Sequence, residues 1–281
     1  MQRKIGADDF RGTKELLLQL VQQGNLGFDL WWACDEYELR GDKIVARFYE
    51  RHEEKWTSYK PLVDTPDLFL KFARLYQASN FREAARRFSQ GYGLLHEPWQ
   101  RQQDLSSFHR RAKQAWNILR LYEAVLNENA RAVELLVSQD LDEDNRLKNS
   151  LEAYKVLFPE GPEEARWLNF AVLEMTFSVN AVVRELCYPA LIFEELTFPQ
   201  DSVKIRRTIG FENLLGAMYL QMYWLMTSRG DLARCEYCGR VISLSRPHPE
   251  SRKRRRDRRF CDDACRQAHH RSKKRSADGP S

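Results

Sequence analysis

The sequence has 281 residues, of which 43% are hydrophobic and 12% aromatic, so it can form a packed core and is not a disordered chain. The net charge of +5 is unevenly distributed: residues 234–281 hold 15 Lys and Arg against 6 Asp and Glu, whereas residues 1–233 hold 30 against 34. A near-neutral body followed by a cationic C-terminal part is typical of proteins with a polyanionic partner.

The sequence also indicates where the protein works. The N-terminus, MQRKIGADDF, lacks the apolar core of a secretory signal, and the longest apolar run, Leu214–Met226, is shorter than the roughly 20 residues that span a bilayer. Four of the six cysteines lie between Cys235 and Cys265, which favours a metal site over a disulfide framework. We therefore expect a soluble cytoplasmic protein with no membrane partner.

The N-terminal part of the chain predicts one helix and a small antiparallel sheet. Apolar residues at helical spacing predict the helix at Thr13–Gln23. The segments Glu36–Arg40 and Lys43–Tyr49 flank Gly41-Asp42 and predict a hairpin with a two-residue turn. Trp56–Leu62 is a candidate third strand.

The middle of the chain is predicted to be mostly helical, because apolar residues recur at helical spacing between capping residues, Pro and Gly. The predicted helices are Asp67–Gln77, Asn80–Phe88, Leu105–Leu126, Ala130–Ser138, Arg146–Leu157 and Glu163–Val179, the last continuing toward Cys187. A β pair, Ala190–Leu196 with Val203–Ile209, precedes a last helix at Phe211–Thr227. This helix is apolar almost all round, which places it in a core or in the interface of a homodimer formed through the body.

These elements predict an α+β protein with a mainly helical body and small antiparallel hairpins. We assign residues 1–230 to the body and residues 231–275 to a finger of treble-clef or zinc-ribbon type with a basic loop and a helix. Residues 276–281 are predicted to be a disordered tail.

The strongest motif consists of two cysteine pairs. Two residues separate Cys235 from Cys238, three separate Cys261 from Cys265, and 22 residues lie between the pairs. Zinc favours four thiolate or imidazole ligands in a tetrahedron, and a turn together with a helix can supply two close pairs. We predict that these cysteines bind one Zn²⁺ and leave no open coordination position, which argues against hydrolytic zinc chemistry. His269, or His270 beside it, is the alternative ligand in place of one cysteine.

The segment 258–271 reads Arg-Arg-Phe-Cys-Asp-Asp-Ala-Cys-Arg-Gln-Ala-His-His-Arg and resembles the endings of bacterial zinc-ribbon proteins. The finger is similar to that of proteins related to the CGNR zinc-finger group, whose N-terminal partner is the ABATE domain and which are regarded as stress-linked transcription regulators. The resemblance implies metal ligation by the two cysteine pairs. The sequence departs from the group signature after Cys265, where Arg-Gln-Ala stands in place of Gly-Asn-Arg.

Basic side chains surround the cysteine pairs, and seven of the eight residues from Arg252 to Arg259 are Lys or Arg. Such density neutralises phosphates and gives salt-sensitive binding. Few aromatic residues are interleaved, which favours the backbone of a duplex over stacking on single-stranded bases. An acidic protein partner and incidental charge are the alternatives. The residues predicted to bind nucleic acid are Arg252, Lys253, Arg254, Arg255, Arg256, Arg258, Arg259, Arg266, Arg271, Lys273, Lys274 and Arg275.

No catalytic motif is found, so we predict that the protein is not an enzyme. The six histidines form no HExxH motif, and GxSxG and phosphate-binding glycine loops are missing. A ββα-metal nuclease would need several histidines between the cysteine pairs, where only His248 lies. The favoured function is a DNA-binding transcription regulator of a bacterial cytoplasm; the other hypothesis is an adaptor whose finger binds protein or RNA. Seven tryptophans could line a pocket for a small effector, although core packing is their commoner role.

Overall fold

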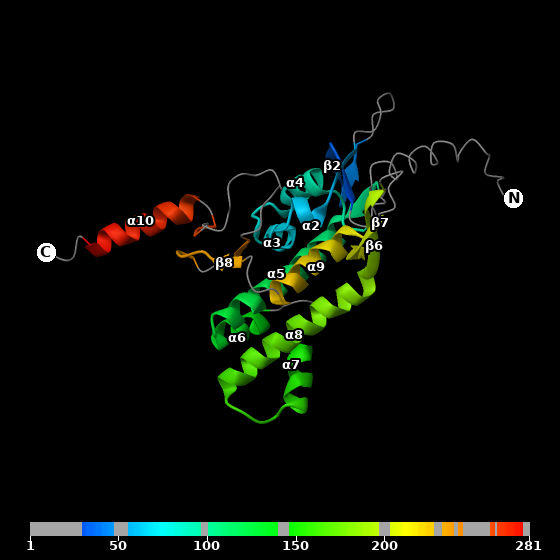
Figure 1. The fold of residues 1–281 in the computed structure, drawn as a ribbon. Helices are drawn as coiled ribbons and strands as arrows, with labels where there is room; N and C mark the ends of the chain where they lie inside the picture. The colour runs from blue at the N-terminus through cyan, green and yellow to red at the C-terminus, as the bar shows by residue number, and fades with distance from the viewer. Residues whose placement is uncertain are drawn as a thin grey trace, which may run out of the picture.

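The computed structural model of the chain describes residues 30–47, 56–96, 101–139, 146–196, 203–227, 232–238, 241–243, 259–261 and 263–277. Within these residues the protein is mainly helical and holds four small antiparallel sheets, which confirms the predicted α+β class (Figure 1). The predicted helix Thr13–Gln23 lies outside the described residues, as do the last two residues of the predicted strand Lys43–Tyr49. None of the described helices is long and apolar enough to cross a membrane.

The elements follow the predicted order closely. The helices are α2 (Pro61–Asp64), α3 (Leu68–Arg74), the 3-10 turn η1 (Leu75–Gln77), α4 (Phe81–Tyr92), α5 (Leu105–Leu126), α6 (Ala130–Ser138), α7 (Arg146–Leu157), α8 (Glu163–Leu186), α9 (Leu214–Thr227) and α10 (Asp263–Ala277). The strands are β1 (Trp31–Cys34), β2 (Tyr37–Arg40), β3 (Lys43–Ala46), β4 (Trp56–Tyr59), β5 (Gln102–Asp104), β6 (Cys187–Leu196), β7 (Val203–Phe211), β8 (Leu232–Arg234) and β9 (Val241–Ser243).

The N-terminal strands form two sheets rather than one. β2 and β3 make the predicted hairpin, with Arg40 opposite Lys43 across the turn, and Gly41 has a φ of 54°, a conformation that glycine adopts without steric cost. β5 extends this hairpin by pairing with β3. The predicted third strand, β4, pairs instead with β1 and ends before Pro61, where α2 begins. Pairing between strands so far apart in the chain depends on tertiary packing, which the local alternation of apolar and polar residues does not reveal.

The apolar helix α9 is part of the core of this chain. Each of its residues from Leu214 to Met222 is buried, and α8 packs against both α9 and α5. Gln221 is the one amide in that segment, and it is satisfied by α2 and α3: its Nε2 donates to the carbonyls of Pro61 (2.9 Å) and Thr65 (2.8 Å), and its Oε1 accepts from the amide of Phe69 (3.0 Å). Of the two predicted locations for this helix, the structure therefore places it in the core.

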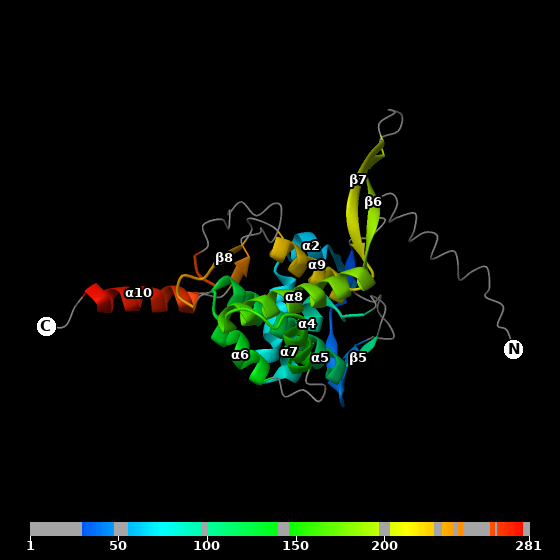
Figure 2. The same ribbon diagram turned by 90° about the horizontal axis from the view of Figure 1, so that it is seen from below.

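β6 and β7 form the predicted second β pair. The pairing begins at Cys187 and ends at Phe211, so β6 starts before the predicted Ala190 and β7 ends after the predicted Ile209. A bulge interrupts the pairing between Phe193 and Glu195. Figure 2 shows this ribbon standing out from the helical body. At the opposite end of the body, beyond α6, lie β8, β9 and α10 (Figures 1 and 2).

Candidate metal centre

The two cysteine pairs come from two different kinds of local structure. β8 and β9 form a hairpin in which Arg234 faces Val241, and Cys235 and Cys238 lie in the connection that follows β8. Cys265 lies in the first turn of α10, and Cys261 lies just before that helix. The sequence led us to expect that one helix supplies the whole second pair, and this is wrong for Cys261, which precedes the helix. The cysteine cluster thus joins a β-hairpin to the start of a helix, an arrangement that can form a finger.

The four sulfur atoms lie close enough together to share one metal ion. All lie within 4.8 Å of one another, with 3.7 Å between Sγ of Cys238 and Cys261 and 3.3 Å between Sγ of Cys261 and Cys265. Tetrahedral Zn–S bonds of about 2.3 Å place their sulfurs about 3.8 Å apart, which falls within this range. A disulfide would need about 2.0 Å, and all six cysteines are free. The four cysteines are thus positioned to bind a metal ion.

Backbone amides favour a thiolate at Cys235. Burial opposes ionisation of this thiol, but hydrogen bonds from the backbone of Cys238, Cys261 and Tyr237 outweigh burial and lower its pKa to about 6. A hydrogen bond from Cys261 acts in the same direction on Cys265, but burial and the sulfurs of Cys238 and Cys235 outweigh it and raise the pKa of Cys265 to about 11. Four thiolates so close together repel one another, and a bound cation would offset that repulsion.

The two halves of the finger are joined next to the cysteines. The amide of Glu236 donates to the carbonyl of Arg259 (2.9 Å), and the guanidinium of Arg259 forms two hydrogen bonds with the Glu236 carboxylate, one of them 2.5 Å long between Nη2 and Oε2. The carboxylate raises the pKa of Arg259 above its usual value. Arg259, predicted as a phosphate contact, therefore joins the segment of Cys235 to that of Cys261.

Phe260 packs on α10, with its ring centroid 5.1 Å from that of His269 and 6.5 Å from that of His270. This contact lies on the half-buried side of the helix, which also carries Cys265. Among the described residues, the side chains that could share one ion are the four cysteines, and His269 does not belong to that group. The alternative in which a histidine replaces a cysteine therefore has no support in the arrangement of these residues.

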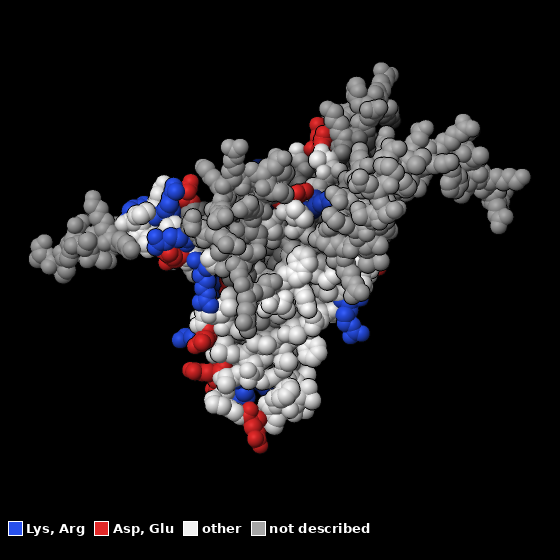
Figure 3. Space-filling view, in the orientation of Figure 1, with Lys and Arg blue, Asp and Glu red and all other residues white. Residues whose placement is uncertain are grey.

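The predicted nucleic-acid residues fall into three groups. Arg252 to Arg258 lie outside the described residues, and Lys273, Lys274 and Arg275 are described only as backbone of α10, which continues to Ala277, two residues past the predicted end of the finger. Arg259, Arg266 and Arg271 are exposed. Arg266 forms an ion pair with Asp263 (3.1 Å) one turn earlier, which is weak because both side chains are exposed. Figure 3 shows Lys and Arg side chains gathered at the finger end of the molecule.

A contact that the sequence did not predict joins the finger to the body. Arg234, at the end of β8, donates one hydrogen bond to the carbonyl of Leu126 and another, 2.5 Å long, to Oδ1 of Asn127. These two acceptors lie at the C-terminal end of α5, where a cation is favoured by the helix dipole. Neither Arg234 nor Asn127 belongs to a motif, so local sequence carries no signal for this contact.

A hollow of about 680 Å³ lies beside this contact, between the α5–α6 turn and the start of α8. Trp167 lines it, whereas Trp31 is buried in the core. The hollow is mainly polar, unlike the aromatic-lined pocket that the tryptophans suggested. The other residues that line it are Asn127, Glu128, Asn129, Ala130, Arg131, Glu134, Glu163 and Glu164.

Comparisons with known proteins do not assign the chain to a family. No protein-family model matches the chain, and searches of curated proteins and of solved structures find no match. The resemblance to the CGNR group thus rests on the finger residues alone.

Proposed function

We propose that the four cysteines bind one Zn²⁺ and that the resulting finger binds duplex DNA, so that the protein acts as a DNA-binding transcription regulator similar to the CGNR group. The observation that carries this proposal is the gathering of four sulfur atoms within 4.8 Å, beside the most basic part of the chain. A metal that folds the finger would also fix the positions of the basic side chains around it. We place the protein in the cytoplasm, where thiols stay reduced.

Four thiolate ligands favour zinc over the harder divalent cations. Mg²⁺ and Ca²⁺ prefer oxygen ligands, whereas zinc accepts four sulfurs in a tetrahedron. Four protein ligands would fill the coordination shell of the ion, so the metal would stabilise the finger rather than activate water. Iron is the other metal found with four thiolates, so metal analysis is the first test.

Exposed cations on the finger support a nucleic-acid partner. Arg266 and Arg271 lie on the exposed side of α10, and the Arg252–Arg258 segment joins Ser243 of the hairpin to the second cysteine pair along the chain. A finger with this charge would displace counterions from a duplex, which gives affinity that falls steeply with salt. An adaptor that binds protein through packing would lose little affinity over the same salt range.

The metal part of the proposal is tested on the full-length protein. We expect one zinc per chain by mass spectrometry under native conditions, and none in Cys261→Ser. The matched control is Cys187→Ala, which removes a half-buried thiol outside the cluster and should keep the metal. Iron in place of zinc, or a chain with no metal under reducing conditions, would refute this part.

The DNA part is tested by titrating a labelled duplex with the zinc-loaded protein over a salt series. If six or more phosphates are contacted, the affinity should fall about 10³-fold or more between 50 and 200 mM salt. Cys261→Ser should abolish this binding, and Cys187→Ala should retain it. A protein with one zinc that binds no duplex would rule out the regulator and leave the adaptor, for which an RNA titration and a protein-partner screen follow.

A further inference from the structure

The helix α10 has two different sides. Cys265, Ala268 and His269 are half-buried, whereas Arg266, Gln267, His270 and Arg271 are exposed. From Arg266 on, these exposed residues occupy positions i, i+1, i+4 and i+5, which lie along one side of a helix. Asp263 and Ala264, in the first turn of α10, are exposed as well. In both Figures 1 and 2 this helix extends away from the helices of the body.

The buried side fixes how the helix is rotated relative to the finger. Cys265 belongs to the cysteine cluster, and one turn later the ring of His269 packs on Phe260 at 5.1 Å. A residue turns about 100° around the helix axis, so Gln267 lies about 200° from Cys265, nearly opposite to it. Arg271 follows Gln267 by four residues and lies on the same side. The structure of the finger therefore presents Gln267 and Arg271 outward.

The residue types on this exposed side are those that distinguish bases. Gln makes paired hydrogen bonds with the N6 and N7 atoms of adenine, and Arg makes them with O6 and N7 of guanine, both in the major groove. Four residues advance about 6 Å along a helix. Bases on one strand are about 3.4 Å apart, so two side chains at this separation reach base pairs one or two steps apart.

We propose that α10 lies in the major groove of duplex DNA and recognises its sequence with Gln267 and Arg271, which select adenine and guanine. This inference rests on the proposed function and extends it from charge-driven binding to sequence readout. Gln267 is uncharged, so the pattern of basic residues did not identify it. Arg266 is assigned no base, because its charge is paired with Asp263 on its own helix. Arg271 also contacts its own helix, but through Nε and a longer bond (3.4 Å) to the uncharged carbonyl of Gln267.

The same geometry favours DNA over other partners. The major groove of B-DNA, about 12 Å wide, admits an α-helix, whereas the major groove of A-form RNA is too narrow for side chains to read. An acidic protein surface could pair with the arginines and accept from the Gln267 amide, but it would require no fixed spacing between Gln267 and Arg271. Binding to duplex RNA or to protein is detected by the RNA titration and the protein-partner screen described for the proposed function.

The test is a selection of randomised DNA duplexes by the zinc-loaded, full-length protein. We expect a short enriched motif in which an adenine and a guanine lie within two base pairs of each other. Gln267→Ala changes no charge, so it should reduce discrimination at the adenine by roughly 5- to 150-fold while the salt dependence of binding stays unchanged. Arg271→Lys keeps the charge but loses the planar guanidinium that forms two hydrogen bonds at once. It should therefore reduce discrimination between bases at the guanine position alone.

Arg266→Lys is the matched control on the same helix and should leave the enriched motif unchanged. Zinc content and far-ultraviolet circular dichroism of each variant establish that the finger is still folded. Salt-dependent duplex binding without any enriched motif would overturn this inference and leave the proposed function standing. A motif that neither Gln267→Ala nor Arg271→Lys alters would also overturn it. Zinc-loaded protein that binds only RNA or protein would overturn both.

Discussion

Nη1 of Arg234, in the first strand of the finger, lies 2.5 Å from Oδ1 of Asn127, the residue that follows the last turn of α5 in the body. The same guanidinium donates to the carbonyl of Leu126, so one side chain contacts two acceptors at the end of α5. Arg234 and Asn127 are 107 positions apart in the chain. This contact joins the finger to the body in addition to the covalent link after α9.

Removing this contact should loosen the finger without unfolding the body. Arg234→Ala deletes exposed charge-assisted hydrogen bonds, so the free energy of unfolding of the body should fall by less than about 1 kcal/mol. The backbone amides of the finger should reorient faster, which NMR relaxation of β8 and α10 would detect. Arg234→Lys keeps the charge at the end of α5 and should show an intermediate effect. Unchanged relaxation in Arg234→Ala would mean that the orientation of the finger does not depend on this contact.

Gln221 should matter more to stability than any other polar side chain of α9. Gln221→Leu would leave the buried amide of Phe69 without its acceptor. It would also remove one of two donors from the carbonyls of Pro61 and Thr65, which still accept from Oγ1 of Thr65 and from the amide of Leu68. An unsatisfied buried polar group costs about 1–3 kcal/mol, so we expect a loss of about 2–3 kcal/mol in urea unfolding. Met222→Leu, which conserves volume one residue away, should cost less than about 1.5 kcal/mol. Equal losses in the two variants would contradict this role for the amide.

Two glycines near the end of α4 should respond in opposite directions to alanine. Gly93 has a φ of 85°, and a Cβ there would lie 2.9 Å from Nε1 of Trp31 and even closer to the carbonyl oxygen of Trp32. Gly93→Ala should therefore destabilise the protein by at least about 1–3 kcal/mol. Gly91 lies within α4 with nothing within 4 Å of its missing Cβ, so Gly91→Ala should stabilise it by about 0.5–1 kcal/mol. Thermal unfolding of both variants checks the sign of each change.

The bounds of several helices could be predicted from the sequence, whereas the pairing of the N-terminal strands could not. The bounds of α5, α6 and α7 are those predicted, because capping residues and helical periodicity are local; Asn129, for example, accepts from the amide of Ala132 at the start of α6. The pairing of β1 with β4 and of β3 with β5 was not predicted, because those partners are brought together by packing. The four-residue helix α2 is too short to produce a periodic pattern.

In the candidate site, too, some features could be predicted from local sequence and others could not. The grouping of the four cysteines was predicted because their chemistry and spacing are visible in the sequence. The pairing of Arg259 with Glu236 was not, because it joins residues 23 positions apart and arginine in a basic segment suggests phosphate first. Gln267 was not predicted because the role that we propose for it depends on which side of α10 faces outward. That orientation depends on Cys265 and His269 together.

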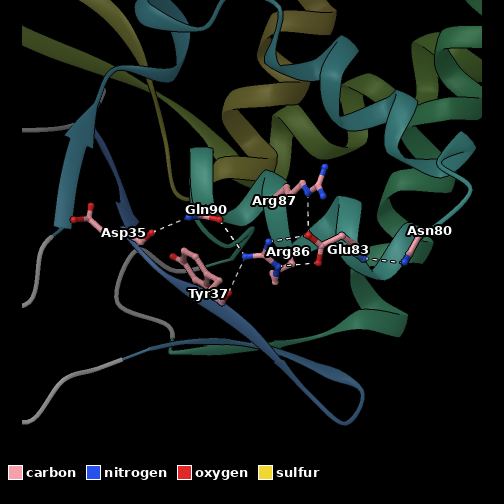
Figure 4. A network of polar contacts seen from close by, with 7 residues as sticks. All are labelled: Asp35, Tyr37, Asn80, Glu83, Arg86, Arg87 and Gln90. Atoms are coloured by element: carbon pink, nitrogen blue, oxygen red, sulfur yellow. Dashed lines mark hydrogen bonds and ion pairs between the residues drawn. The ribbon is translucent and has the colours of Figure 1, made fainter.

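α4 is joined to the β2–β3–β5 sheet by a network of hydrogen bonds and ion pairs around the Glu83 carboxylate and the Arg86 guanidinium (Figure 4). The Glu83 carboxylate accepts from Arg86 and Arg87, at 2.8 Å from Nη2 of Arg86 and 2.9 Å from Nε of Arg87. Nη1 of Arg86 in turn donates to the carbonyl of Tyr37 in β2 (3.2 Å). Hydrogen bonds from Arg86, and then those from Arg87, lower the pKa of Glu83 from 4.5 to about 2.

This lowered pKa predicts how the stability of the network depends on pH. Because the pKa is lower in the folded than in the unfolded protein, the stabilisation by Glu83 is present above pH 4.5 and is lost as the pH falls toward 2. The urea midpoint of Glu83→Gln should therefore lie below that of the parent protein at pH 7, and the difference should shrink between pH 5 and pH 2. Glu152→Gln, which removes an exposed pair with Lys155, should show little difference at any pH. A midpoint difference for Glu83→Gln that stays constant down to the lowest pH at which the protein folds would show that the carboxylate contributes through packing and not through its charge.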